Sequence, residues 1–75
     1  MSTNRADYRY IVKELPYKES SVWALECYPE TQQLPFVSKT GSMYIELKQG
    51  ITEVEAKELR DMLNEKASYI TVINP

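Results

Sequence analysis

The sequence GITEVEAKELRDMLNEKA, residues 50–67, is the one segment whose local chemistry fixes its own structure. Thr52 can accept a hydrogen bond from the backbone N–H of Glu55, and the Glu55 carboxylate can accept one from the backbone N–H of Thr52. This reciprocal pair satisfies two donors that the first turn of a helix otherwise leaves without partners. The segment therefore predicts a helix that begins at Thr52.

The predicted helix is amphipathic. Its apolar positions fall within about a third of the circumference, which is the width that one face of a sheet can cover. They are Ala56, Leu59, Met62, Leu63 and Ala67. The opposite side is mostly acidic, and Glu53 precedes Lys57 by four residues, which is the favourable order for an ion pair on a helix. One side of this helix is therefore expected to cover a sheet.

Three extended segments precede the helix. Residues 8–15, 21–28 and 42–48 are rich in β-branched and aromatic residues, and prolines end the first two. The first has no cleanly apolar face, so we expect it at an edge of the sheet. Residues 1–7 lack apolar periodicity and are expected to form a disordered N-terminal arm, which leaves residues 8–75 as a single domain.

A last strand is expected at residues 69–73, which gives the order β-β-β-α-β and an α+β class. The first three strands predict an antiparallel meander, with the amphipathic helix packed on one face and the C-terminal strand joining the sheet. A right-handed crossover would make that strand parallel to its neighbour and the sheet mixed. The predicted core consists of Ile11, Trp23, Leu25, Cys27, Met43, Ile45, Leu47, Leu59, Met62, Leu63, Ile70 and Val72.

Composition argues against catalysis. The chain of 75 residues has no histidine, so the commonest general base and most zinc sites are missing. Its two glycines form no phosphate-binding loop. The single cysteine, Cys27, lies in the apolar row of a strand, where a buried thiol is expected instead of a nucleophile. We therefore predict no enzyme, cofactor or metal.

Charge and hydropathy limit the classes of partner that the chain could bind. The formal net charge is −2, which gives no long-range attraction to nucleic acid or to an anionic membrane. The chain lacks an apolar run of about 18 residues and a signal-peptide pattern, and one cysteine excludes an internal disulfide. We expect a cytoplasmic protein with no membrane role.

Six tyrosines are the most suggestive feature for function. Tyr28, Tyr44 and either the set Tyr8 and Tyr10 or Tyr69 are expected on the sheet face opposite the helix. They could be half-exposed strand residues without a role, a surface for a protein partner or a second copy of the chain, or a platform that stacks the bases of single-stranded nucleic acid. The neutral sheet and acidic helix argue against nucleic acid.

The connection over residues 29–41 is long for a small domain and contains an apolar patch, Leu34-Pro35-Phe36-Val37. The patch could turn inward and close the core, or it could be an exposed anchor for a partner. Burial of Phe36 distinguishes the two alternatives.

Residues 50–59, followed by Leu63-Asn64 and Tyr69-Ile70-Thr71-Val72, resemble the ends of small uncharacterised proteins encoded by bacteriophages and prophages. The resemblance covers residues 50–72 only. It implies a bacterial or viral origin and an accessory protein that binds and modulates other macromolecules.

We therefore predict a small non-enzymatic binding protein that forms a homodimer and engages a protein partner. The candidate partner-binding residues are Tyr10, Tyr28, Tyr44, Phe36 and Leu34. The alternative is a single-stranded nucleic-acid-binding protein that uses the tyrosine-bearing face.

Overall fold

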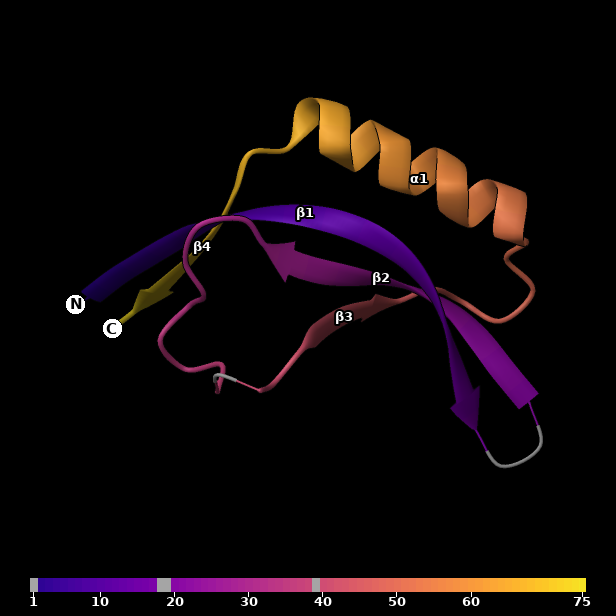
Figure 1. The fold of residues 1–75 in the computed structure, drawn as a ribbon, viewed down its shortest axis with the longest axis horizontal. Coiled ribbons are helices and arrows are strands. Elements are labelled where there is room, and N and C mark those ends of the chain that lie inside the picture. Colours follow the sequence, from indigo (N-terminus) through magenta and orange to yellow (C-terminus); the bar gives the residue numbers. More distant parts are fainter. Residues whose placement is uncertain (1, 18–19, 39) are drawn as a thin grey trace.

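The computed structural model describes residues 2–17, 20–38 and 40–75, and these form one helix and a four-stranded antiparallel sheet (Figure 1). In chain order the elements are β1 (Ser2–Tyr17), β2 (Ser20–Pro29), β3 (Met43–Glu46), α1 (Glu53–Lys66) and β4 (Tyr69–Asn74). The strands lie in the order β3-β2-β1-β4. The α+β class is confirmed, but β1 is a central strand and the expected edge position is wrong.

The C-terminal strand differs most from the expectation. β4 runs antiparallel to β1 and pairs with residues 2–7, so the sheet is not mixed. Residues 2–7 are therefore strand and not a disordered arm, although Met1 lies outside the described residues. Their order comes from backbone pairing with a segment more than sixty positions away, for example Ser2 with Asn74. Apolar periodicity cannot reveal such pairing, because only Ala6 in this segment is buried.

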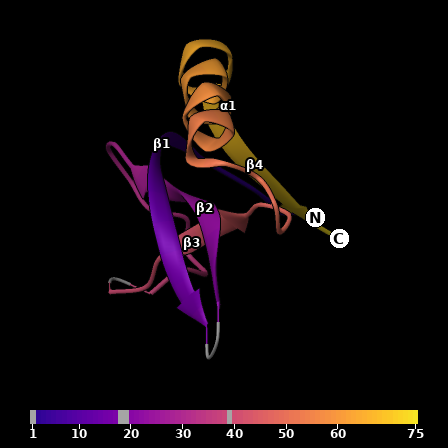
Figure 2. The same cartoon turned by 90° about the vertical axis from the view of Figure 1, so that its right-hand side faces the viewer.

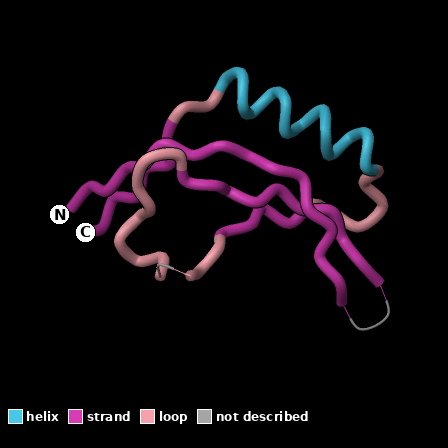
Figure 3. Tube along the Cα trace, viewed as in Figure 1, coloured by secondary structure: helices cyan, strands magenta, loops and turns pink. Residues whose placement is uncertain are grey.

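β1 changes partners along its length. Its first six residues pair with β4, and residues 8–17 pair with β2. The strand curves between the two ribbons (Figure 1), and the two chain ends lie side by side beyond the body of the sheet (Figure 3). We call the ribbon formed by residues 2–7 and β4 the terminal arm. Residues 18–19, between β1 and β2, lie outside the described residues.

The helix begins as its sequence predicts. Thr52 Oγ1 accepts a hydrogen bond from Glu55 N at 3.2 Å, and Thr52 N donates one to Glu55 Oε1 at 3.1 Å. Lys57 Nζ lies 3.0 Å from Glu53 Oε1. Gly50 has a φ of 97°, a conformation that favours glycine, at the turn into the helix. α1 packs against β1 and β2, and Figure 2 shows it nearly end-on, beside β1 and away from β3.

The core lies on one face of the sheet. Strand register places Tyr8, Tyr10 and Val12 of β1 on the same face as Leu25 and Cys27 of β2, because residues paired across antiparallel strands project to the same side. We call this the core face. Leu34 from the long connection lies in the same buried cluster. Other apolar residues pack against the cluster, namely Val37, Met43, Leu59, Leu63, Ala67, Ile70 and Val72.

The predicted core was too wide. Ile45 and Met62 are exposed by 42% and 46%, and Trp23, Leu47 and Ile11 are only half-buried. Ile11 lies on the opposite face of the sheet, and Ile45 and Met62 are exposed because α1 covers β1 and β2 but makes no comparable contact with β3. Side chains on β3 and on the outer flank of the helix therefore stay accessible. Tyr8 and Tyr10 fill the core instead, with 6% and 7% of their surfaces exposed.

Candidate partner-binding face

The opposite side of the sheet, which we call the open face, is built from the alternate residues of β1, β2 and β3. The register aligns Ile11 with Glu26 and Glu26 with Tyr44, and the neighbouring rows complete a regular grid. Those rows are Arg9 beside Tyr28, and Lys13 beside Ala24 and Glu46. Residues of α1 and of the long connection pack against the buried cluster of the core face, which is the other side of the sheet.

Three tyrosines project from the open face, one on each of its strands. Tyr17 and Tyr28 are each 52% exposed, and Tyr44 is 41% exposed. Tyr28 and Tyr44 therefore lie where the sequence places them. Tyr17 was missed because Pro16 suggested the end of the strand, whereas β1 continues through Tyr17. Pro16 fits there because its nitrogen points away from β2, where no ladder hydrogen bond is needed. Counting alternate positions beyond Pro16 would have found Tyr17.

Charges on the open face balance. Arg9 and Lys13 supply two positive charges and Glu26 and Glu46 two negative ones. Lys13 Nζ lies 3.9 Å from Glu26 Oε1, and the Tyr17 hydroxyl donates a hydrogen bond to Glu46 Oε1. That bond to a carboxylate, together with a smaller effect of burial, raises the pKa of Tyr17 above its usual value. The hydroxyl therefore remains a neutral donor, and the face combines aromatic surface with a balanced number of charges.

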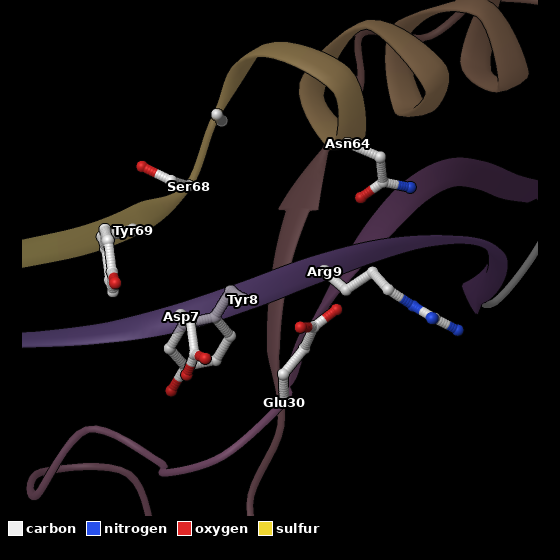
Figure 4. A pocket seen from close by; sticks show the side chains of 8 residues that line it. Asp7, Tyr8, Arg9, Glu30, Asn64, Ser68 and Tyr69 are labelled. Carbon is white, nitrogen blue, oxygen red and sulfur yellow. The ribbon is translucent and has the colours of Figure 1, made fainter.

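Asn64 of α1 forms hydrogen bonds with the edge of β1, just beyond the residues that pair with β4. Its side-chain Oδ1 accepts from Tyr10 N at 2.8 Å, and its Nδ2 donates to Tyr10 O at 3.0 Å. An asparagine side chain thus takes the place of a neighbouring strand where β4 has left β1. Asn64 also borders a hollow of about 300 Å³ lined by Asp7, Arg9, Glu30 and Tyr69, among others (Figure 4).

Two of the polar side chains that line this hollow, Asn64 and Asp7, already have hydrogen-bond partners. Both polar groups of the Asn64 amide already bond the backbone of Tyr10. The Asp7 carboxylate accepts hydrogen bonds from Thr31 Oγ1 at 2.5 Å and from Thr31 N at 3.3 Å. The side-chain bond from Thr31 lowers the pKa of Asp7. Asp7 therefore acts as an anchor for the start of the long connection.

Two apolar residues of the long connection, Leu34 and Phe36, were candidates for partner binding, and they differ in exposure. Leu34 is 1% exposed, and its N–H donates to the Tyr8 hydroxyl at 3.0 Å. Phe36, two residues later, is 58% exposed. Both alternatives for the patch are thus realised in part, since one residue closes the core and the other faces solvent. Leu34 and Tyr10 are buried and present no surface to a partner, whereas Phe36 does.

Two further kinds of group could carry chemistry, a thiol and a cluster of metal ligands. Cys27 is a free, buried thiol, and burial raises its pKa, which disfavours the nucleophilic thiolate. Across residues 2–17, 20–38 and 40–75, no cluster of three or more His, Cys, Asp or Glu residues could hold a metal ion. In the same part of the chain, no helix has the length and apolar character needed to cross a membrane.

Comparison with protein-family models, curated proteins and solved structures finds no match to this chain.

Proposed function

We propose that this chain is a non-enzymatic binding protein that engages a protein partner through the open face and acts as a homodimer. The observation that carries the proposal is the set of exposed tyrosines on three neighbouring strands, Tyr17, Tyr28 and Tyr44. Tyrosine combines a large apolar surface with a hydrogen-bonding group at low conformational cost, and it is enriched where proteins bind one another.

The surroundings of these tyrosines support a protein ligand. Half-buried Ile11, Leu15 and Val22 lie on the same face as the rings, and Lys13 beside them lies 3.9 Å from Glu26. Protein interfaces combine aromatic and apolar side chains with polar groups that can pair across the contact. The resemblance of residues 50–72 to phage-encoded proteins extends the proposal to an accessory role in a bacteriophage or prophage. The free thiol of Cys27 fits a reducing compartment, so we place this role in the cytoplasm.

Quantitative affinity capture from a bacterial lysate tests the partner. The wild-type protein is compared with a Tyr28→Ser/Tyr44→Ser variant and with Val54→Ser, which removes a 65% exposed apolar side chain from the helix. A partner of the open face is retained by wild type and by Val54→Ser and lost by the tyrosine variant. Equal capture by all three proteins would contradict the proposal.

Single-stranded nucleic acid is the alternative ligand, because the same tyrosines could stack bases. Glu26 and Glu46 offset the basic residues of the face, so binding would depend on stacking more than on phosphate contacts. Fluorescence anisotropy with a labelled oligonucleotide at several salt concentrations decides this alternative, since phosphate-driven binding weakens steeply as salt rises. Oligonucleotide binding that is lost in the Tyr28→Ser/Tyr44→Ser variant would replace the protein-ligand proposal.

A further inference from the structure

We propose that the free edge of β4 pairs with β4 of a second copy of this chain in an antiparallel register centred on Thr71. This inference rests on the homodimer part of the proposed function and assigns its interface. The terminal arm is a two-stranded ribbon formed by residues 2–7 and β4. Such ribbons are marginally stable alone, and three or more strands are normally needed. Pairing of two arms produces four adjacent strands.

The backbone direction of β4 follows from the hydrogen bonds of β1. Tyr10 N and O bond Asn64, so they point away from β2. Alternation along β1 gives Ala6 and Asn4 the same direction, toward β4. Their partners Ile70 and Val72 therefore direct their backbone groups inward. The N–H and C=O groups of the intervening residues, Tyr69, Thr71 and Ile73, point outward along the free edge.

The outward residues are complementary to their own copy. A two-fold axis perpendicular to the sheet pairs residues of the same side-chain face, so a register centred on Thr71 sets Thr71 opposite its copy and Tyr69 opposite Ile73. These are Thr–Thr and aromatic–β-branched cross-strand pairs, both of which stabilise sheets. The same register makes the outward groups of all three residues hydrogen-bonded pairs. This single register therefore provides both the backbone hydrogen bonds and the favourable side-chain pairs.

β4 lacks the features that normally prevent edge pairing. Residues 69–74 contain no charged residue and no proline. Ile73 and Tyr69 are exposed by 61% and 51%. Natural edge strands are usually protected by lysine, proline or a bulge, and an unprotected apolar edge promotes strand addition. Arg5 of β1, whose guanidinium lies 3.8 Å from the centroid of the Tyr69 ring, stacks on that ring, and β4 is the end strand of the sheet.

The other edge of the sheet is a poorer candidate. β3 has four residues, Met43–Glu46, against six in β4. Met43 and Ile45 pair with β2, and alternation leaves Tyr44 and Glu46 to present outward backbone groups. A symmetric register centred on Glu46 sets this carboxylate opposite its own copy, and like charges directly opposite destabilise a strand pair.

Sedimentation equilibrium over a wide range of protein concentrations tests the interface. Thr71→Pro removes an N–H that points outward, so the ladder to β1 is kept while the centre of the proposed dimer loses hydrogen bonds in both copies. We expect dimerisation to weaken about tenfold or more. Tyr44→Pro, which changes β3 in the same way, is the matched control and should dimerise like wild type.

A second variant and a second readout guard against misfolding. Thr71→Lys keeps every backbone hydrogen bond but sets like charges opposite each other across the axis, and it should also favour the monomer. In the wild-type protein, amide exchange at Tyr69, Thr71 and Ile73 should slow as concentration rises, while Ile70 and Val72 are protected at all concentrations.

Three results would overturn the inference. They are a wild-type monomer at the highest concentration, a dimer that Thr71→Pro and Thr71→Lys leave intact, and a dimer that only Tyr44→Pro disrupts. Failure here leaves the open-face proposal standing, because Tyr28 and Tyr44 lie outside the β4 edge and are tested by partner capture.

Discussion

The two faces of the sheet use the same residue type for opposite purposes. On the core face, Tyr8 and Tyr10 are almost fully buried, and the Tyr8 hydroxyl accepts the N–H of Leu34. On the open face, Tyr28 and Tyr44 alternate with charged residues and remain exposed. A tyrosine in a strand therefore says little about its own burial. Which elements cover each face decides it, and here α1 and the long connection cover only one.

The largest effect should come from removing a side chain at the centre of the core face. Leu25 is fully buried, so Leu25→Ala leaves a cavity and should lower the free energy of unfolding by about 3 kcal/mol. For a domain of 75 residues this is a large part of the total stability. Urea unfolding followed by far-UV circular dichroism measures the change.

The matched substitution on the open face is Tyr44→Ala. Tyr44 is 41% exposed and no helix packs over it, so the loss should stay within about 0.5 kcal/mol. If the two variants were destabilised equally, the distinction between a covered and an open face would be lost.

A smaller effect is expected at the edge where the faces meet. Asn64→Ala removes both hydrogen bonds to Tyr10 and leaves the backbone N–H and C=O of Tyr10 without those partners. We expect a loss of about 2 kcal/mol, since an unsatisfied group costs more than the bond it loses. The neighbouring exposed residue provides the control, because Glu65→Ala should change the unfolding free energy little. Thermal unfolding of both variants shows whether Asn64 holds α1 beside β1.

The smallest effect concerns the connection that covers the core face. Thr31 lowers the pKa of Asp7 in the folded state, so this carboxylate contributes stability above its ordinary pKa of 3.8. The contribution is lost as the pH falls through the lower, folded pKa, because protonation then favours the unfolded chain. An NMR titration of the Asp7 carboxyl in wild type and in Thr31→Val measures the shift.

In Thr31→Val the pKa of Asp7 should rise toward the ordinary value, while Thr31→Ser should preserve the depression. An unchanged pKa in Thr31→Val would show that Thr31 does not anchor the connection to the terminal arm.

The sequence predicted what local chemistry determines. The capping pair of Thr52 and Glu55 identified the start of α1, and the alternation of Leu25 and Cys27 identified the buried side of β2. Pairing between distant segments could not be predicted. β1 carries no sign that it exchanges β4 for β2 after residue 7, and this exchange made it central and ordered its first residues.

The candidate site was predicted in part for the same reason. Tyr28 and Tyr44 were placed correctly because their strands alternate clearly. Tyr10 was misplaced because neither side of its strand is strongly apolar, so the sequence could not show which one α1 would cover. Leu34 and Phe36 lie two positions apart in an irregular segment, where no period relates burial to sequence. Their different exposures follow from the contact of Leu34 with Tyr8.

Chemical modification of the tyrosines under native conditions tests the two-face account most directly. The protein is treated briefly with a tyrosine-nitrating reagent at low concentration, and modified residues are identified by mass spectrometry. We expect Tyr28 and Tyr44 to react readily, whereas Tyr8 and Tyr10 should be protected until the protein is unfolded. Rapid modification of Tyr8 and Tyr10 in the folded protein, or protection of Tyr28 and Tyr44 in the monomer, would contradict it.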